Sequence, residues 1–377
     1  MPIYMDHNAT TPIDPRVAAA MRPYLEEMFG NASSASHAYG WQAQSAVKKA
    51  REQVAGLLGC RATDVLWTSG ATESNNMAIL GLVKNYCPEK PHLITQATEH
   101  KAVLEVIEAA QDLGAEVTVL GVDEDGRIRM DELRAAIRPS TLLISIMMAN
   151  NEVGTLQPVR EIGELCKEKR IVFHTDAAQS ACKFPFNLKE LNVDMISLSG
   201  HKIYGPKGVG ALAIRPVNRE FELKPLLYGG EQERRLRPGT LNVPGIVGFG
   251  EACSFSAQEL REECERLQAW RDELIKAVEE NIPGARLNGP RAGRLCNNVS
   301  FSFSDVTPDD MALGLSGLAY SAGSACNSSN PKPSHVLKAM GLSDQLARST
   351  LRLGLGRFTT QEDVATVKAK LFSLARR

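Results

Sequence analysis

Polar residues of complementary chemistry follow β-like segments of this sequence. Lys202 comes after MISLSG (195–200), and Asp176 ends IVFHTD (171–176). An amine at a strand end can form a Schiff base with an aldehyde cofactor, whereas a carboxylate pushed out of an apolar core needs a cationic partner, such as a protonated ring nitrogen. Each residue taken alone has a simpler interpretation, because most loop lysines are solvated and an aspartate before a helix often caps it.

Three further motifs suggest phosphate binding, ring stacking and amide donation. Ser69–Asn75 lies between a strand and a helix, where backbone N–H groups and the Thr72 hydroxyl can bind phosphate. His100 is placed to stack on a planar ring and to move protons near neutral pH. Asn151 follows LLISIMM (142–148) in the same manner. Capping or structural roles explain each motif separately, but they do not explain why all of the motifs occur together.

A cysteine and an arginine complete the series. Cys326 lies in SAGSACNSSNPKPS (321–334), a segment with no apolar residue larger than alanine, which predicts a flexible exposed loop with a functional thiol. Arg352 lies in a short alternating run between Arg348 and Arg357. An arginine in a pocket binds an α-carboxylate through two parallel hydrogen bonds, and the alternative is three solvated cations beside a strand.

These residues need a scaffold that brings strand ends together. Between about residues 60 and 215, β-rich runs alternate with helical patterns, which predicts an α/β fold with a mostly parallel sheet covered by helices on both faces. Ligands bind such sheets at the carboxyl ends of the strands. The predicted strands are 93–98, 117–123, 142–148, 171–176, 195–200 and 209–214, and the predicted helices are 72–84, 102–112, 130–137 and 159–169.

The rest of the chain predicts a smaller α+β domain. Its expected elements are a long charged helix, a strand and two further helices, at 254–282, 297–303, 308–316 and 361–375. The N-terminal segment 1–30 is too short to be a domain and is expected to pack with it. We expect residues 15–252 to form a large cofactor-binding domain. Residues 1–14 and 253–377 are expected to form the small domain that carries the Cys326 loop.

Composition excludes several classes of protein. The 377 residues are 43% hydrophobic and 23% charged, as in ordinary globular proteins. The 43 basic and 44 acidic residues nearly balance, so we expect neither nucleic acid nor a membrane as a partner. The eight cysteines include no Cys-x-x-Cys pair, and the sequence predicts no metal site. With no recognisable secretion signal or membrane span, this cysteine usage predicts a cytoplasmic protein.

The sequence resembles the cysteine desulfurases of the class-V aminotransferase family, which are pyridoxal-phosphate enzymes of fold type I. The family's motifs occur in the family's order: YMDHNATTP, SGATESNN, ATEH, ANNEVGT, HTDAAQS, SGHKIYGPKGVG, RPGT and SAGSAC. The segment around Cys326 is similar to the long-loop group, which includes nitrogen-fixation and housekeeping iron–sulfur enzymes. The resemblance implies a seven-stranded type of sheet in the large domain and pyridoxal 5'-phosphate as cofactor.

The resemblance also implies a role for each site residue. Lys202 would hold the cofactor and later move protons, and Cys326 would take sulfur from L-cysteine as a persulfide and leave alanine. Arg352 would bind the substrate carboxylate, and His100 would stack on the cofactor ring. The residues implied to contact the phosphate are Ala71, Thr72, Ser199 and His201, together with Thr240 from a second subunit. Asp176 is implied to contact the ring nitrogen. Gln179 and Asn151 are implied to contact the phenolate oxygen or nearby groups, including the substrate.

Partners follow from the same resemblance. A shared Thr240 implies a homodimer, and a persulfide implies a sulfur-acceptor protein. The chain ends soon after LGRFTT, whereas housekeeping members continue, so the acceptor stays open between an iron–sulfur scaffold, a thiolation relay and another sulfur pathway. Asn327 stands where the family usually has threonine, and the sequence leaves open whether Cys326 transiently ligates a cluster. The alternative functions are a selenocysteine lyase and a non-catalytic sulfur-carrier partner on the same fold.

Overall fold

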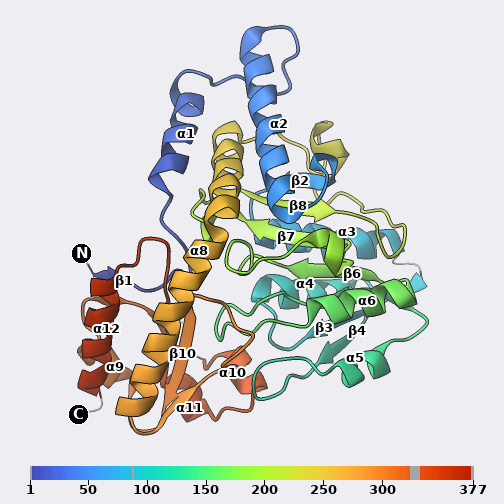
Figure 1. The fold of residues 1–377 in the computed structure, drawn as a ribbon. Helices are drawn as coiled ribbons and strands as arrows, with labels where there is room; N and C mark the ends of the chain where they lie inside the picture. Colours follow the sequence, from blue (N-terminus) through green and yellow to red (C-terminus); the bar gives the residue numbers. More distant parts are fainter. Residues whose placement is uncertain (1, 87–88, 323–331, 375–377) are drawn as a thin grey trace.

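A seven-stranded sheet forms the centre of the molecule (Figure 1). The computed structural model describes residues 2–86, 89–322 and 332–374. The strand order is β2-β8-β7-β6-β5-β3-β4, and β8 runs antiparallel to both of its neighbours while the β7-β6-β5-β3-β4 run is parallel. The predicted fold class is confirmed. The strands are β2 (Val65–Thr68), β3 (His92–Gln96), β4 (Glu116–Leu120), β5 (Thr141–Ser145), β6 (Val172–Asp176), β7 (Met195–Ser199) and β8 (Gly210–Ile214).

Alternate residues of the central strands face two different layers of helices. On β5, Leu143 packs in the hydrophobic cluster that contains α3 (Ala71–Tyr86) and α4 (Lys101–Asp112). Ile144 packs in the cluster that contains α2 (Ala38–Leu58), α6 (Val159–Lys169) and α8 (Val243–Asn281). This alternation follows from the period of two in an extended chain, and burial of both faces accounts for the continuous apolar runs. The helices that flank this sheet include α2 (Ala38–Leu58), α3 (Ala71–Tyr86), α4 (Lys101–Asp112), α5 (Met130–Ala136), α6 (Val159–Lys169) and α7 (Leu188–Leu191).

A second, antiparallel sheet lies at the other end of the molecule, in the order β12-β13-β10-β9, and a separate parallel pair joins β1 to β11. Phe301 and Phe303 of β10 pack in one cluster with Leu371 of α12. The elements of this part are β1 (Ile3–Tyr4), β9 (Ala285–Leu287), β10 (Asn298–Phe303), α9 (Pro308–Gly314), β11 (Leu318–Ala319), β12 (Ser321–Ala322), α10 (His335–Ala339), α11 (Asp344–Arg348), β13 (Thr350–Gly354) and α12 (Gln361–Leu374).

Helix α8 (Val243–Asn281) runs along both parts of the molecule (Figure 1). Its first half contributes Phe249 to the cluster under the large sheet, and its second half contributes Leu274 to the cluster under the small sheet. The helix starts at Val243 rather than at residue 254, because the glycines before residue 254 allow other parts of the chain to pack closely against it. A Cβ atom on Gly250 would meet the Cα of Ala50 in α2 at 2.6 Å. The predicted division between residues 252 and 253 falls inside this helix and stays a prediction.

The N-terminal segment divides between the two parts. Met5 packs under the small sheet, whereas Val17 of α1 (Pro15–Glu26) packs in the cluster that includes the first half of α8. The N-terminal segment thus contacts both parts of the molecule, and the predicted division between residues 14 and 15 stays a prediction. Among the described residues, no helix has the length and apolar character needed to cross a membrane.

Candidate active site

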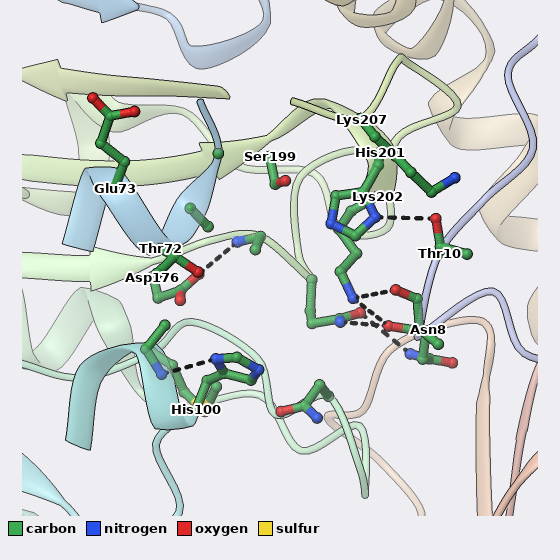
Figure 2. Close-up of a pocket in the computed structure, with 18 of the residues that line it drawn as sticks. Asn8, Thr10, Thr72, Glu73, His100, Asp176, Ser199, His201, Lys202 and Lys207 are labelled. Carbon is green, nitrogen blue, oxygen red and sulfur yellow. Dashed lines mark hydrogen bonds between the residues drawn. The ribbon is translucent and has the colours of Figure 1, made fainter. Parts of the chain in front are cut away.

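A cavity of about 650 Å³ lies at the carboxyl ends of the parallel strands (Figure 2). Because β7, β6, β5 and β3 are parallel neighbours, the residues that follow them reach the same edge of the sheet. Ten predicted site residues line this cavity: Ala71, Thr72, His100, Asn151, Asp176, Gln179, Ser199, His201, Lys202 and Arg352. Cys326 lies outside the described residues. Thr240 is exposed and does not line the cavity.

The amine of Lys202 reaches across the cavity to the N-terminal segment. Its Nζ donates hydrogen bonds to the backbone carbonyls of Asn8, at 2.6 Å, and Ala9, at 2.8 Å. Burial lowers the pKa of Lys202 to about 7, and the positive charges of Lys183 and Arg352 contribute in the same direction. A large fraction of the side chain is therefore an uncharged amine at neutral pH, which is the nucleophilic form.

A residue of the N-terminal segment forms hydrogen bonds to the turn that carries Lys202. Thr11 Oγ1 donates to the carbonyl of His201 at 2.9 Å and accepts from the backbone N–H of Tyr204 at 2.8 Å. Tyr204 has a φ of 64°, an unusual conformation for a bulky residue. These contacts stabilise a turn that Tyr204 would otherwise disfavour, and they fix the base of the Lys202 side chain.

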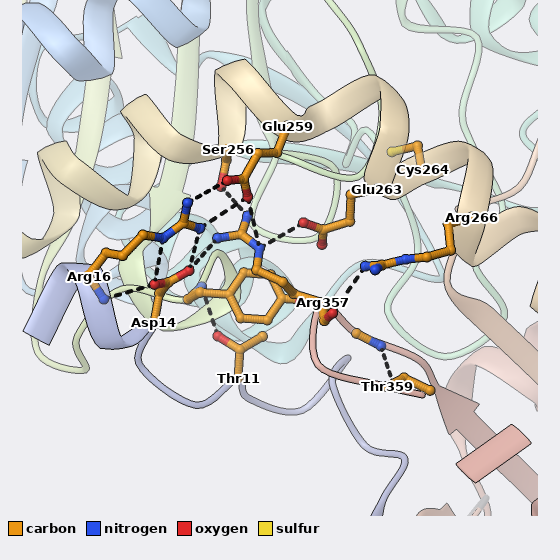
Figure 3. Close-up of polar contacts among 12 residues, drawn as sticks. Thr11, Asp14, Arg16, Ser256, Glu259, Glu263, Cys264, Arg266, Arg357 and Thr359 are labelled. Atoms are coloured by element: carbon orange, nitrogen blue, oxygen red, sulfur yellow. Dashed lines mark hydrogen bonds and ion pairs between the residues drawn. The ribbon is translucent and has the colours of Figure 1, made fainter. Parts of the chain in front are cut away.

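A buried ion network supports the same turn from the other side (Figure 3). Arg357 donates to Asp14 and to Glu263, each at 2.8 Å, and its guanidinium lies 4.4 Å from the ring centre of Tyr204. Arg16 also binds Asp14, and the two arginines hold the pKa of that carboxyl well below its usual range. The network joins the N-terminal segment, α8 and the turn after β13.

Asp176 is the last residue of β6 and faces the cavity with its carboxylate fixed. Its Oδ2 accepts from Asn75 Nδ2 at 2.8 Å, and its Oδ1 accepts from the backbone N–H of Ala178 at 2.8 Å. Both side chains are buried, with Asp176 6% exposed. Because the donors to this buried carboxylate from the described residues are neutral, it suits a cationic ligand atom in the cavity.

The opposite end of the cavity suits an anion. The N-terminus of α3 opens into it at Ala71 and Thr72, and the Ser199 hydroxyl lies across from the helix end. A Cβ atom on Gly70 would enter this space, where its nearest neighbour would be Ser199 Oγ at 3.7 Å. The gap is lined by helix N–H groups and a hydroxyl, which is the pattern that binds phosphate.

His201 and His100 also line the cavity. Burial, followed by three nearby lysines, lowers the pKa of His201 to about 4, so its ring is neutral and bonds with Thr10 Oγ1 at 3.0 Å. His100 Nδ1 accepts from the backbone N–H of Ala102 at 3.1 Å, and burial lowers its pKa as well. This bond leaves the proton of neutral His100 on Nε2, where it is available to a ligand.

Arg352 of β13 lies between this cavity and an adjoining one of about 410 Å³. Its two terminal nitrogens bind Asp6, Ser321 and the carbonyl of Asn151, at 2.6–3.0 Å. Its Nε is buried and has no hydrogen-bond partner within residues 2–86, 89–322 and 332–374. The adjoining cavity is also lined by Ala322 and Lys332, the described residues on either side of the segment that contains Cys326.

Comparisons with known proteins agree with this geometry. The family model for aminotransferase class-V matches residues 3–367. The chain belongs to the class-V aminotransferase family. A relative named cysteine desulfurase IscS, from Anaeromyxobacter sp. (strain Fw109-5), is 50% identical over 97% of this chain and 90% of its own length. The predicted family is confirmed.

Solved structures of similar proteins share the whole fold. One described as a NifS-like protein superposes with a TM-score of 0.91 at 37% identity and covers 99% of both chains. Another, described as SspA in complex with cysteine, has a TM-score of 0.83 at 39% identity and covers 95% of this chain and all of its own.

The class-V family uses pyridoxal phosphate, and the residues present fit that group. Asp176 suits the ring nitrogen, the α3 end with Ser199 suits the phosphate, and Lys202 supplies the amine. The buried Nε of Arg352, for which the described part of the chain supplies no hydrogen-bond acceptor, suits an anionic substrate group. The donors and acceptors thus match both ends of the cofactor, and the predicted cofactor is supported by structure and family alike.

Sequence reasoning missed three residues of this class-V site. The backbone carbonyl of Asn8 accepts a hydrogen bond from Lys202 Nζ, and no sequence pattern predicts this contact. Asn75 follows Thr72 by three residues in a predicted helix, so its position on the cavity side could have been inferred. Lys183 has an ordinary loop context and gave no signal, although it is buried.

Proposed function

We propose that this protein is a cysteine desulfurase that uses pyridoxal phosphate to convert L-cysteine to L-alanine and to place the sulfur on Cys326. The observation that carries the proposal is the Lys202 amine, with its pKa near 7, in a cavity that also holds Asp176 and Arg352. The family match and the relatives named cysteine desulfurase bear out the predicted activity and cofactor. The solved SspA complex with cysteine supports L-cysteine as substrate.

Each residue of the site has a separate role in the proposed reaction. When bound, pyridoxal phosphate supplies an electron sink. Asp176 keeps the ring nitrogen protonated, and Arg352 binds the substrate carboxylate and so fixes which bonds face the ring. Lys202 Nζ would move the proton from the substrate Cα. His100, which lines the cavity and carries its proton on Nε2, would exchange a proton with the substrate sulfur.

Sulfur transfer balances without an external oxidant. The Cys326 thiolate attacks the substrate sulfur, so an S–S bond forms while the substrate Cβ–S bond breaks. The broken Cβ–S bond leaves its electron pair on the substrate carbon, and Cβ takes up a proton in place of the sulfur. The products are alanine and a persulfide on Cys326, which must pass its outer sulfur to an acceptor.

We infer the remaining features from the resemblance. The protein forms a homodimer in which Thr240 of one subunit contacts the phosphate in the other site, and exposure of Thr240 outside its own cavity is compatible with this arrangement. A sulfur-acceptor protein takes the persulfide, and the reaction occurs in the cytoplasm. Size-exclusion chromatography with light scattering, together with Thr240→Ala, tests the shared site through cofactor affinity.

An absorbance spectrum before and after addition of L-cysteine tests the function directly, with alanine and sulfide assayed in the same tube. We expect a band near 400 nm that shifts with cysteine, and equal amounts of alanine and sulfide when a reductant is present. Cys326→Ser should keep the band and lose sulfide release, whereas Lys202→Ala should lose the band. Sulfide release by Cys326→Ser at the wild-type rate would contradict the proposed nucleophile.

A further inference from the structure

Lys183 is a buried cation next to the cavity that the proposed mechanism does not use. It lies in the segment after β6 and is only 5% exposed. No carboxylate forms an ion pair with it among the residues that the structure describes. An ammonium group without a counter-ion is unfavourable to bury, so its position indicates a polar or anionic group that it serves.

The Lys183 ammonium faces the side chain of Gln179. Its Nζ lies 3.5 Å from Gln179 Oε1, and Asn8 Nδ2 lies 3.4 Å from the same oxygen. Gln179 Nε2 donates to the carbonyl of Asn8 at 2.8 Å. The reverse amide orientation would set the NH2 group against two donors and the oxygen against a carbonyl. The orientation is therefore determined, and the second Nε2 hydrogen remains for a ligand in the cavity that Gln179 lines.

The same network reaches the reactive lysine. The carbonyl of Asn8 accepts from Gln179 Nε2 and also from Lys202 Nζ. The charged groups around Lys202 are Lys183, Arg352, Asp176 and Asp6, and after burial Lys183 has the largest effect on its pKa. Those around Lys183 are Glu263, Arg352 and the thiols of Cys182 and Cys296. Burial lowers the pKa of Lys183 to about 8, so it carries its charge at neutral pH.

We propose that Lys183 is a positioning residue: it fixes the Gln179 amide as a donor toward the anionic ring oxygen of pyridoxal phosphate, and it places positive charge behind the amine of Lys202. The inference rests on the proposed function, because the ring oxygen belongs to that cofactor. An anionic ligand in the cavity then supplies the counter-charge for Lys183, which forms no ion pair with a carboxylate of the described residues.

The charge-removing variant Lys183→Met tests this role in the complete protein. Pyridoxal phosphate is added to cofactor-free protein across a pH series, and the visible band reports how much Lys202 has reacted. Loss of the neighbouring positive charge favours protonation of Lys202, so the pH midpoint should rise by about one unit. The cofactor should also bind more weakly, by roughly tenfold, as expected for loss of one favourable charge interaction.

Two further variants separate charge from packing. Lys183→Arg keeps the charge and should return the midpoint close to that of the wild type. Lys189→Met removes an exposed lysine of α7 and should change neither the midpoint nor the affinity. If Lys183→Met does not fold, Lys183→Gln provides the same charge comparison.

The outcomes distinguish this inference from the proposed function. Wild-type protein that takes up no pyridoxal phosphate would overturn the function. Uptake by Lys183→Met with the wild-type midpoint and affinity would overturn the role of Lys183 alone. Cys264 and Cys296 lie on the other side of Lys183 with their sulfurs 3.4 Å apart. A change in their alkylation rate without a change in the cofactor spectrum would show that Lys183 serves the thiols, and would also overturn the inference.

Discussion

Asn75 Nδ2 lies 2.8 Å from Asp176 Oδ2, and this hydrogen bond joins two parts of the site that the sequence separates by about a hundred residues. Asn75 belongs to α3, whose N-terminus faces the phosphate end of the cavity, whereas Asp176 ends β6. The helix whose end is proposed to bind the cofactor phosphate thus also orients the carboxylate that is proposed to contact the ring nitrogen. A shift of α3 along its axis would disturb both contacts together.

The Asn75–Asp176 pair predicts a graded loss of activity. Asp176→Asn removes the charge that keeps the ring nitrogen protonated, so kcat/KM for cysteine should fall by roughly 100-fold or more. Asn75→Ala keeps the charge and removes one hydrogen bond to it, so the loss should be about tenfold. Steady-state alanine formation measures both. Asn76→Ala is the neighbouring control, because the side chain of Asn76 donates to the backbone carbonyl of Thr72 and not to Asp176. Equal losses in the two variants would contradict the division of roles.

The lowered pKa of Lys202 predicts fast cofactor uptake near neutral pH. The uncharged amine is the reactive form, so the rate at which cofactor-free protein forms its visible band should reach half its maximum near pH 7. An ordinary lysine would give a midpoint more than three units higher. Stopped-flow absorbance from pH 5.5 to 10 measures the profile. Lys202→Ala should form no band, and Lys207→Ala, which removes another lysine that lines the cavity, should keep it. A midpoint near 10 would refute the assignment.

Much of this site could be predicted from sequence because of how the central sheet is buried. β6 and β7 are buried throughout, so Asp176 and Lys202 stand out as charged residues at or just after the ends of buried strands. The contact between Lys202 and Asn8 could not be predicted, because a backbone carbonyl is common to every residue and the N-terminal segment has no regular period. The start of α8 was missed because Gly250 resembles a loop residue until the close approach of α2 is known. The role of Cys326 stays a prediction.

The contacts of Arg352 predict a defect in substrate binding. Two of its nitrogens are already held by Asp6, Ser321 and the carbonyl of Asn151, so the guanidinium plane is fixed before substrate arrives. Arg352→Lys keeps the charge but loses the planar pair of donors, and KM for cysteine should rise by about tenfold or more. The cofactor band should be unchanged. Loss of the band with an unchanged KM would place Arg352 on the cofactor instead of the substrate.

The buried network around Arg357 predicts a large effect on stability. Arg357 and its partners Asp14 and Glu263 are each less than 10% exposed. Arg357→Met therefore removes the guanidinium partner of two buried carboxylates. We expect the free energy of unfolding to fall by about 3 kcal/mol in urea denaturation. Arg261 of α8 pairs with Glu265 on the surface, and Arg261→Met should leave the same quantity nearly unchanged. Similar effects of the two substitutions would contradict this account.

The buried carboxyl of Glu99 predicts that its contribution to folding stability falls as the pH rises. The side chain is fully buried and accepts from the Met147 backbone N–H and from Gln96, and burial raises its pKa to about 8. The folded protein therefore holds the Glu99 proton more tightly than the unfolded chain does. This contribution to stability is complete below about pH 4.5 and is lost as the pH rises toward 8.

Glu99→Gln removes this pH-dependent contribution because its amide is neutral at every pH. Relative to the wild type, the variant should gain stability progressively between about pH 4.5 and 8, reaching roughly 2–4 kcal/mol above pH 8, with no further change at higher pH. Urea denaturation at equal cofactor saturation, followed by circular dichroism, measures the difference. Glu105→Gln on the exposed side of α4 should show no such trend. A difference between Glu99→Gln and the wild type that stays constant from pH 5 to 9 would mean that Glu99 is ionised throughout this range, despite its burial.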